Sequence, residues 1–109
     1  MLDMGALSAG KLSVHEYLDL DRKAEIPSEY HDGGLFPIEA VTMKHSAISV
    51  NLIVLLKKEC SPPCHPFGAP LRVRVSPARF VLPDLMVVCG KPETTDEYHD
   101  TITNPKFIA

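Results

Sequence analysis

The chain has 109 residues and a formal net charge of −3, with 45% apolar and 23% charged residues. This length suggests one small domain, and the composition is that of a globular protein and excludes general disorder. The acidic balance argues against a broad basic surface for nucleic acid, although it leaves room for a local basic patch. The longest apolar runs are far shorter than a membrane span.

Three cysteines are present, and this odd number argues against a closed disulfide framework. A reducing setting, and with it a cytoplasmic location, is the simpler interpretation. The opening segment lacks a positive region and a long apolar run, so it does not resemble a signal peptide. We expect residues 1–12 to form a flexible lead-in and residues 13–109 to form the domain.

The first predicted helix covers residues 14–24, because Ser13 and Glu16 have the spacing of a capping box. A β-hairpin follows, in which the Asp32-Gly33 pair is a strong turn signal. Its predicted arms are residues 29–31 and 35–41.

Residues 44–59 carry a long apolar run with polar ends, which favours a second, well-buried helix. The β-branched residues in this run leave a strand as the alternative.

The second half of the sequence predicts mainly strands. Prolines and a glycine indicate a loop over residues 60–70, and the alternating LRVRV predicts a half-exposed strand. Phe80 to Cys89 predicts a buried strand interrupted at Pro83. A polar loop follows, and the final residues 106–109 resemble the start of another strand. The order of helices and strands predicts an α/β or α+β fold.

Asp84 is the first candidate site residue, because it follows Pro83 inside an otherwise apolar segment. Its carboxylate is a hard oxygen ligand that suits Mg²⁺, while a solvated aspartate at a strand end is the simpler alternative. Glu29 is a candidate second ligand, or else a surface acid at the hairpin. His45 opens the second predicted helix, where it is either a surface residue or a donor to phosphate.

The cysteine-containing loop offers a weaker signal. Cys60, Cys64 and His65 suggest zinc ligands, but no second pair lies at a suitable spacing. We therefore expect a proline-rich loop with free thiols, and we expect Cys89 to act as a small core residue. Arg72 and Arg74 share one face of their strand, so they are either solvated or in contact with phosphate.

Six segments in this order resemble one known family: SVHEYLDL, IPSEYHDGGLFPI, KHSAISVNLIVLL, LRVRV, FVLPDLMVVCG and TITNPKFIA. Together they resemble the Uma-type putative restriction endonuclease family of the PD-(D/E)XK nuclease superfamily. The resemblance covers residues 12–109. It implies a partial restriction-endonuclease-like core, with a mixed sheet flanked by helices, and it implies DNA as the partner.

The resemblance also assigns roles to the three candidates. Asp84 matches the aspartate of the superfamily's PD motif and would hold Mg²⁺ or Mn²⁺, with Glu29 as the acidic residue that faces the metal and His45 as the histidine that opens the helix. In the family, a strand bearing Glu-Val-Leu-Ser and then a lysine follow the segment that resembles NPKFIA. The chain ends at Ala109, before these residues.

We therefore expect little or no nuclease activity from this chain, because hydrolysis needs further ligands and a cation. The alternatives are a degenerate, non-enzymatic fragment or interaction module, and a small-molecule or metal-binding domain that uses His31, Asp32 and His45. A missing neighbour strand would expose the edge of residues 80–89, so we also expect aggregation or a homodimer through that edge.

Overall fold

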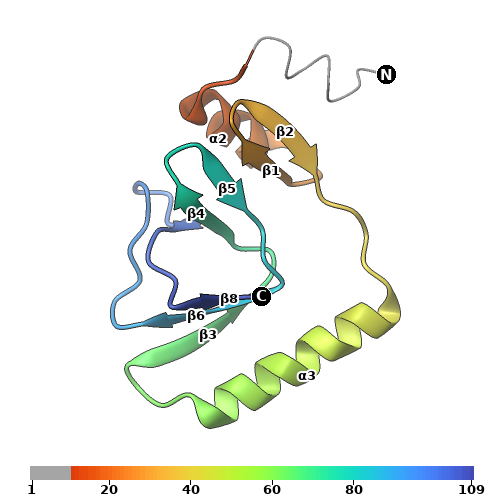
Figure 1. Cartoon of the computed structure of the whole chain (residues 1–109), viewed down its shortest axis with the longest axis vertical. Helices are drawn as coiled ribbons and strands as arrows, with labels where there is room; N and C mark the ends of the chain where they lie inside the picture. The colour runs from red at the N-terminus through yellow and green to blue at the C-terminus, as the bar shows by residue number, and fades with distance from the viewer. Residues whose placement is uncertain (1–10) are drawn as a thin grey trace. The chain divides into compact units, whose positions relative to one another are not determined.

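The computed structural model describes residues 11–109, which form two compact units (Figure 1). The first unit contains the described residues up to Glu39 together with Val75–Val81. The second contains Ala40–Arg74 and Leu82–Ala109. Helices and strands occur together, and strand pairs are both parallel and antiparallel, so the predicted α+β class with mixed sheet pairing is confirmed.

The first unit begins with Lys11, so most of the predicted flexible lead-in lies outside the described residues. Leu12, the last residue of this lead-in, makes two hydrogen bonds. The Leu12 N–H donates to the Gly33 carbonyl at 3.1 Å, and the Tyr30 hydroxyl donates to the Leu12 carbonyl at 2.6 Å. Leu12 thus contacts the residues of the hairpin, and the flexibility of the lead-in stays a prediction.

Helix α2 (Val14–Lys23) starts at the predicted capping box. The Glu16 N–H donates to Ser13 Oγ at 3.1 Å, and the Ser13 N–H donates to Glu16 Oε1 at 2.9 Å. These two bonds satisfy backbone donors that a helix start otherwise leaves unpaired. The predicted helix is confirmed, and it ends one residue earlier than expected.

The predicted hairpin is also present, formed by β1 (Ser28–His31) and β2 (Gly34–Pro37). Asp32 and Gly33 have φ values of 48° and 92°, and a tight two-residue loop of type I′ requires positive φ at both positions. The second arm is shorter than predicted and ends at Pro37. Strand β5 (Arg79–Val81) pairs with β1 on its other side, so the order is β2-β1-β5, all antiparallel.

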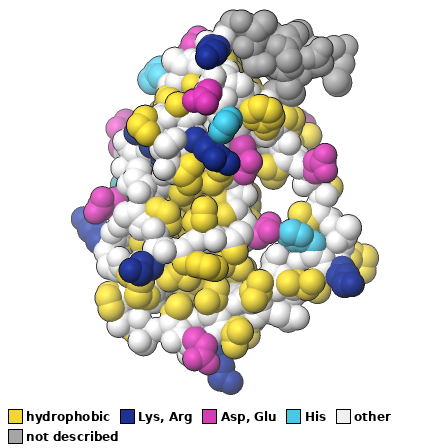
Figure 2. Space-filling model, in the orientation of Figure 1, with side chains coloured by type: hydrophobic (Ala, Val, Ile, Leu, Met, Phe, Trp, Pro, Cys, Tyr) yellow, Lys and Arg dark blue, Asp and Glu magenta, His cyan; other side chains and the backbone are white. Residues whose placement is uncertain are grey.

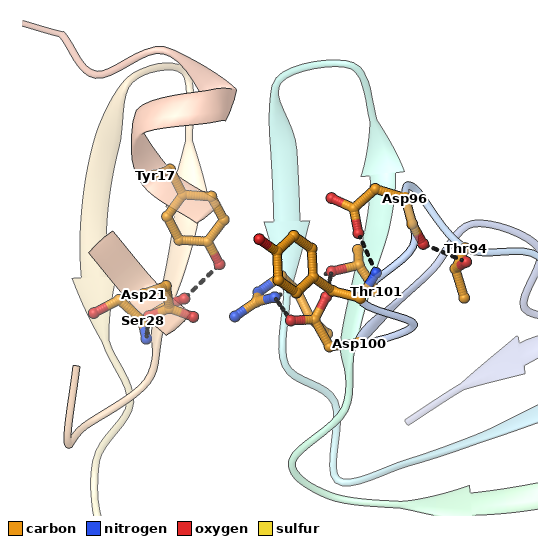
Figure 3. Close-up of polar contacts among 9 residues, drawn as sticks. Tyr17, Asp21, Ser28, Thr94, Asp96, Asp100 and Thr101 are labelled. Carbon is orange, nitrogen blue, oxygen red and sulfur yellow. Dashed lines mark hydrogen bonds and ion pairs between the residues drawn. The ribbon is translucent and has the colours of Figure 1, made fainter. Parts of the chain in front are cut away.

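Aromatic side chains form the core of the first unit. Tyr17, Tyr30 and Phe80 are buried together with Leu18, and the rings of Tyr17 and Tyr30 stack with centroids 4.8 Å apart. Polar bonds tie α2 to β1 at the rim of this core (Figure 3). The Tyr17 hydroxyl donates to the Ser28 carbonyl at 2.7 Å, and the Ser28 N–H donates to Asp21 Oδ1 at 2.8 Å.

In the second unit, an antiparallel sheet has the order β3-β6-β8. Its strands are β3 (Cys64–Gly68), β6 (Leu85–Cys89) and β8 (Phe107–Ile108). Strand β4 (Arg72–Ser76) pairs in parallel with β7 (Thr101–Ile102), with Arg72 opposite Thr101.

Two predictions about these strands need correction, and a third is confirmed. Residues 64–68 form a strand where a loop was predicted, and β3 lies at the edge of its sheet, where prolines are tolerated. Thr101 and Ile102 form β7 inside the predicted polar loop, and both are buried. The segment from Phe80 to Cys89 forms two strands, β5 and β6, with the predicted interruption at Pro83 between them.

The prediction of an open edge along β6 is wrong. Val87 of β6 faces Pro66 of β3 on one side and Phe107 of β8 on the other. The short final strand therefore pairs with backbone groups that we expected to remain free. Self-association through the edge of β6 loses its structural basis.

The cysteines also differ from expectation. Cys64 and Cys89 form a disulfide, and only Cys60 is a free thiol. The two bonded residues face each other across β3 and β6, which brings together thiols that are distant in sequence. The prediction of free thiols in the loop is therefore confirmed for Cys60 and wrong for Cys64, and the prediction of Cys89 as a simple core residue is wrong.

Helix α3 (Met43–Glu59) confirms the predicted helix and excludes the strand alternative. The prediction that it is well buried is wrong, because none of its residues is buried. Its half-buried residues are Ser49, Ile53 and Leu56, and the helix contacts β3. Figure 2 shows hydrophobic side chains at the surface near the lower end of the view, where α3 lies. Large aliphatic residues of α3 that are exposed include Ile48, Val50, Leu52, Val54 and Leu55.

The prediction for Arg72 also needs correction, because its side chain is buried and not solvated. It is 8% exposed, and its Nη1 donates to Thr101 Oγ1 at 3.1 Å and lies 3.4 Å from Asp100 Oδ2. Figure 3 shows Asp100 and Thr101 at this cluster. Arg72 therefore has a structural ion pair, which accounts for it better than a phosphate contact does.

Candidate functional site

Asp84 and His45 lie side by side in the second unit. Asp84 Oδ2 is 2.8 Å from His45 Nε2, although the two residues are separated by 39 positions in the sequence. Both side chains are 43% exposed, so the pair is open to solvent. Two of the three predicted site residues are thus in direct contact.

Local structure explains where each member of the pair lies. Thr42 caps the start of α3, and its Oγ1 accepts a hydrogen bond from the His45 N–H at 3.1 Å, which places His45 in the first helical turn. The Asp84 N–H donates to the Ala109 carbonyl at 2.8 Å, just before β6 begins. A helix cap and the last residue of the chain therefore hold the pair.

The contact also determines where the imidazole carries its proton. An ionised carboxylate only accepts hydrogen bonds, so Nε2 of His45 must be the protonated nitrogen when it bonds to Asp84. In neutral His45, Nδ1 then has the free lone pair. This nitrogen can accept a proton or bind a metal ion, while Asp84 retains Oδ1 for another ligand.

A groove of about 110 Å³ lies beside the pair. His45 and Asp84 provide its ionisable side chains, and Ser49 adds a hydroxyl. Its other lining residues are apolar: Ile48, Leu52, Leu85 and Ala109. The groove combines one carboxylate side chain and one imidazole with an apolar wall.

This donor set fits part of a metal site. Asp84 offers the hard oxygen that Mg²⁺ prefers, and His45 adds a nitrogen that suits Mn²⁺ or Zn²⁺ better. Within residues 11–109, no three His, Cys, Asp or Glu side chains come together as a ligand group. His31, Asp32 and His45 therefore do not form a ligand group among these residues, and neither do Cys60, Cys64 and His65.

Glu29, the third predicted site residue, lies on β1 in the first unit. It faces Phe36 across the hairpin and lines a pocket of about 210 Å³ together with residues of β2 and β5. The structure therefore brings His45 and Asp84 together and places Glu29 in a different unit. That Glu29 shares a metal with Asp84 stays a prediction.

Two residues that support the pair were not among the predicted site residues. Thr42 was missed as the helix cap, although a threonine before an apolar run is a recognisable signal. Ala109 contributes through its backbone carbonyl, and no sequence pattern reports such a contact.

Comparison with known proteins adds to this geometry. The sequence model of the family described as "Uma2: Putative restriction endonuclease" matches residues 14–109. The chain belongs to the Uma2 family. This membership confirms the resemblance drawn from the ordered segments.

A curated relative of this Uma2 chain is "Uncharacterized protein sll1609" from Synechocystis sp. (strain ATCC 27184 / PCC 6803 / Kazusa). The two are 30% identical over 100 residues, which is 90% of this chain and 56% of the relative. The chain therefore spans little more than half the length of the curated relative that it matches.

A crystal structure described as a putative nuclease belonging to DUF820, from Anabaena variabilis ATCC 29413, has a similar fold. Its TM-score is 0.64 at 24% identity, with 85% of this chain and 51% of the other chain covered. At this identity the similarity establishes the fold of the Uma2 chain. None of the helices in residues 11–109 is long and apolar enough to cross a membrane.

Proposed function

We propose that this Uma2 chain contributes to a Mg²⁺- or Mn²⁺-dependent DNA endonuclease-like domain, and that Asp84 is its metal ligand. The contact of Asp84 with His45 at the edge of a groove carries the proposal, because it joins a hard oxygen donor to a base within one accessible site. Family membership and the fold similarity support the nuclease class.

Asp84 and His45 would have different roles in such a site. When bound, the metal would polarise a phosphate and lower the pKa of a water molecule. Asp84 would hold the metal through Oδ1. His45 would fix the carboxylate through Nε2 and accept a proton at Nδ1, as an imidazole oriented by a carboxylate does in other hydrolases.

We expect little cleavage by the 109-residue chain itself. Among residues 11–109, Asp84 is the one carboxylate side chain that lines the groove, whereas metal-assisted hydrolysis generally uses more ligands and a cation near the phosphate. The domain would then be incomplete in this chain, in line with its coverage of about half of the relatives.

A calorimetric titration with MnCl₂ tests the ligand. Asp84→Ala should abolish measurable Mn²⁺ binding. His45→Gln should weaken the affinity for Mn²⁺ by roughly 10-fold, which is the lower end of the range for residues that orient a metal ligand. Asp19→Ala is the matched control, since Asp19 is an exposed carboxylate on α2. Equal binding by the Asp84→Ala and Asp19→Ala variants would contradict the assignment.

Glu29 requires its own experiment, because it is proposed as a second ligand. Glu29→Gln should weaken Mn²⁺ binding if the two carboxylates share the ion. An unchanged affinity would limit the site to Asp84 and His45. Plasmid nicking in Mg²⁺ or Mn²⁺ measures catalysis separately, and robust nicking by the chain alone would refute its predicted inactivity.

The competing proposal is a non-enzymatic fragment or interaction module. The hydrogen bond between His45 and Asp84 Oδ2 favours this alternative, because it leaves fewer carboxylate oxygens of Asp84 for a metal ion. A chain that binds no Mn²⁺ but retains its fold would support this alternative. A homodimer and a cytoplasmic location are further proposals. Light scattering tests the homodimer, which the edge of β6 no longer supports because β3 and β8 pair with it on both sides.

A further inference from the structure

The outer face of the sheet β2-β1-β5 carries a group of side chains, of which Glu29 alone is also assigned to the proposed metal site. Strand residues alternate between the two faces of a sheet. Tyr30, Leu35 and Phe80 belong to the core beneath α2. Their neighbours on the opposite face line the pocket of about 210 Å³, to which Tyr30 and Phe80 also contribute. These neighbours are Glu29, His31, Phe36, Arg79 and Val81.

Strand register brings the polar members of this group together. His31 faces Arg79 across β1 and β5, and Glu29 faces Phe36 across β1 and β2. The side chains of directly opposed residues lie close to each other. One cation, one imidazole, one carboxylate and one aromatic ring therefore share a single exposed surface.

Phe36 is the most unusual member of this surface, because its side chain is 55% exposed. Its ring lies against the backbone of Gly34, where an added Cβ would lie 3.3 Å from Phe36 Cε2. The His31 ring approaches at a centroid distance of 6.4 Å and an interplanar angle of 71°. Because Gly34 has no side chain, it leaves room for the Phe36 ring, and this ring remains accessible to a planar ligand.

These groups match the parts of a nucleotide. An exposed aromatic ring stacks on a nucleobase, and an arginine donates to a phosphate. A carboxylate accepts hydrogen bonds from base amino groups. In a duplex, the base faces are covered by neighbouring bases, so an open ring of this kind favours a single strand.

We propose that the outer face of β2-β1-β5 is a binding site for single-stranded DNA, with a base on Phe36 and a phosphate at Arg79. The choice of DNA rests on the proposed function, whereas the site itself lies in the first unit and uses neither Asp84 nor His45.

Fluorescence anisotropy with the full chain and a labelled single strand of about 12 nucleotides tests this site. EDTA in the buffer removes any contribution from a metal. Phe36→Ala should weaken binding roughly 10- to 100-fold, which is the usual loss for one stacked base, and Phe36→Trp should restore it. Phe107→Ala is the matched control, because Phe107 is 51% exposed and lies in the second unit.

Arg79 should make a different contribution. Arg79→Gln should weaken binding of the single strand. It should also make the negative slope of log affinity against log salt concentration shallower by roughly 0.7, which is the change for one phosphate contact on a single strand. Lys58→Gln, which alters an exposed cation of α3, should leave the slope unchanged. A duplex of the same sequence should bind more weakly than the single strand.

Two results would overturn the inference. One is an equal effect of Phe36→Ala and Phe107→Ala in variants that retain the wild-type circular dichroism spectrum. The other is tighter binding of the duplex. Asp84→Asn separates this inference from the proposed function, because it should abolish Mn²⁺ binding and leave DNA binding in EDTA unchanged. A wild-type chain that binds Mn²⁺ but no single strand refutes this inference, whereas one that binds the single strand but no Mn²⁺ refutes the proposed metal site.

Discussion

The two helices of this chain differ in how their apolar residues are arranged. In α2, which has 10 residues, Tyr17, Leu18 and Asp21 are buried. In α3, which has 17 residues and more aliphatic side chains, none is buried. The shorter, more polar helix is therefore the better packed of the two.

The difference teaches that the arrangement of apolar residues decides burial more than their number does. In α2, Val14, Tyr17 and Leu18 follow helical spacing and form one stripe, which meets the aromatic core. In α3, apolar residues surround the whole helix, and one sheet covers only the face that carries Ile53. A helix that is apolar on all sides needs cover on all sides.

The largest expected effect separates a buried residue of α2 from an exposed residue of α3. Tyr17→Ala should lower the free energy of unfolding by about 3–5 kcal/mol, because Tyr17 is 0% exposed and stacks on Tyr30. Leu55→Ala should cost less than about 1 kcal/mol, since Leu55 is 53% exposed. Urea denaturation measures both values.

The Tyr17→Phe variant provides the control for this pair. It keeps the ring and removes the hydrogen bond to the Ser28 carbonyl, so it should cost about 1 kcal/mol. Equal losses for Tyr17→Ala and Leu55→Ala would show that α3 is buried in solution and that the comparison fails.

A second prediction compares two faces of α3. Ile53→Ala should destabilise the chain by roughly 1–2 kcal/mol, because Ile53 is half-buried and its Cδ1 approaches Gly68 of β3. Val54→Ala should stay within about 0.5 kcal/mol, because Val54 is 61% exposed. Thermal unfolding of both variants checks this order, and a larger loss for Val54→Ala would reverse the assignment of faces.

A third prediction concerns the helix caps, where the two helices are more alike. Ser13→Ala should cost about 1 kcal/mol, since it removes the acceptor for the Glu16 N–H. Thr42→Ala should cost about 0.5–1 kcal/mol for the same reason at the His45 N–H. Ser13→Asp keeps an acceptor and should restore most of the loss, and circular dichroism follows the helix content.

The smallest expected effect is a dependence on pH at the start of α2. Hydrogen bonds from the Ser13 backbone N–H and then from its hydroxyl lower the pKa of Glu16 below its usual value. Because the pKa is lower in the folded state, the stabilisation is fully present above the unfolded pKa. It is lost as the pH falls through the folded pKa.

Glu16→Gln tests this effect, because glutamine keeps a capping acceptor but does not titrate. The unfolding midpoint of this variant should fall less steeply than that of the wild type as the pH drops below about 4.5, the usual pKa of the group. Parallel curves for the two proteins would show that Glu16 makes no such contribution.

The sequence by itself determined features that depend on neighbouring residues. The Ser13–Glu16 capping box, the Asp32-Gly33 turn and the break at Pro83 were all predicted and are all present. Each depends on steric limits or hydrogen bonds within a few residues, so local sequence is sufficient. The order of the segments also indicated the family, and with it the choice of Asp84 and His45.

The tertiary structure alone decided which distant segments meet. It placed His45 at 2.8 Å from Asp84, joined Cys64 to Cys89, and used Thr101 in a buried strand of a segment that looks like a polar loop. It also left α3 exposed on the faces that its sheet does not cover. Burial and long-range pairing depend on what the rest of the chain brings alongside a segment, and that information is not contained in the segment itself.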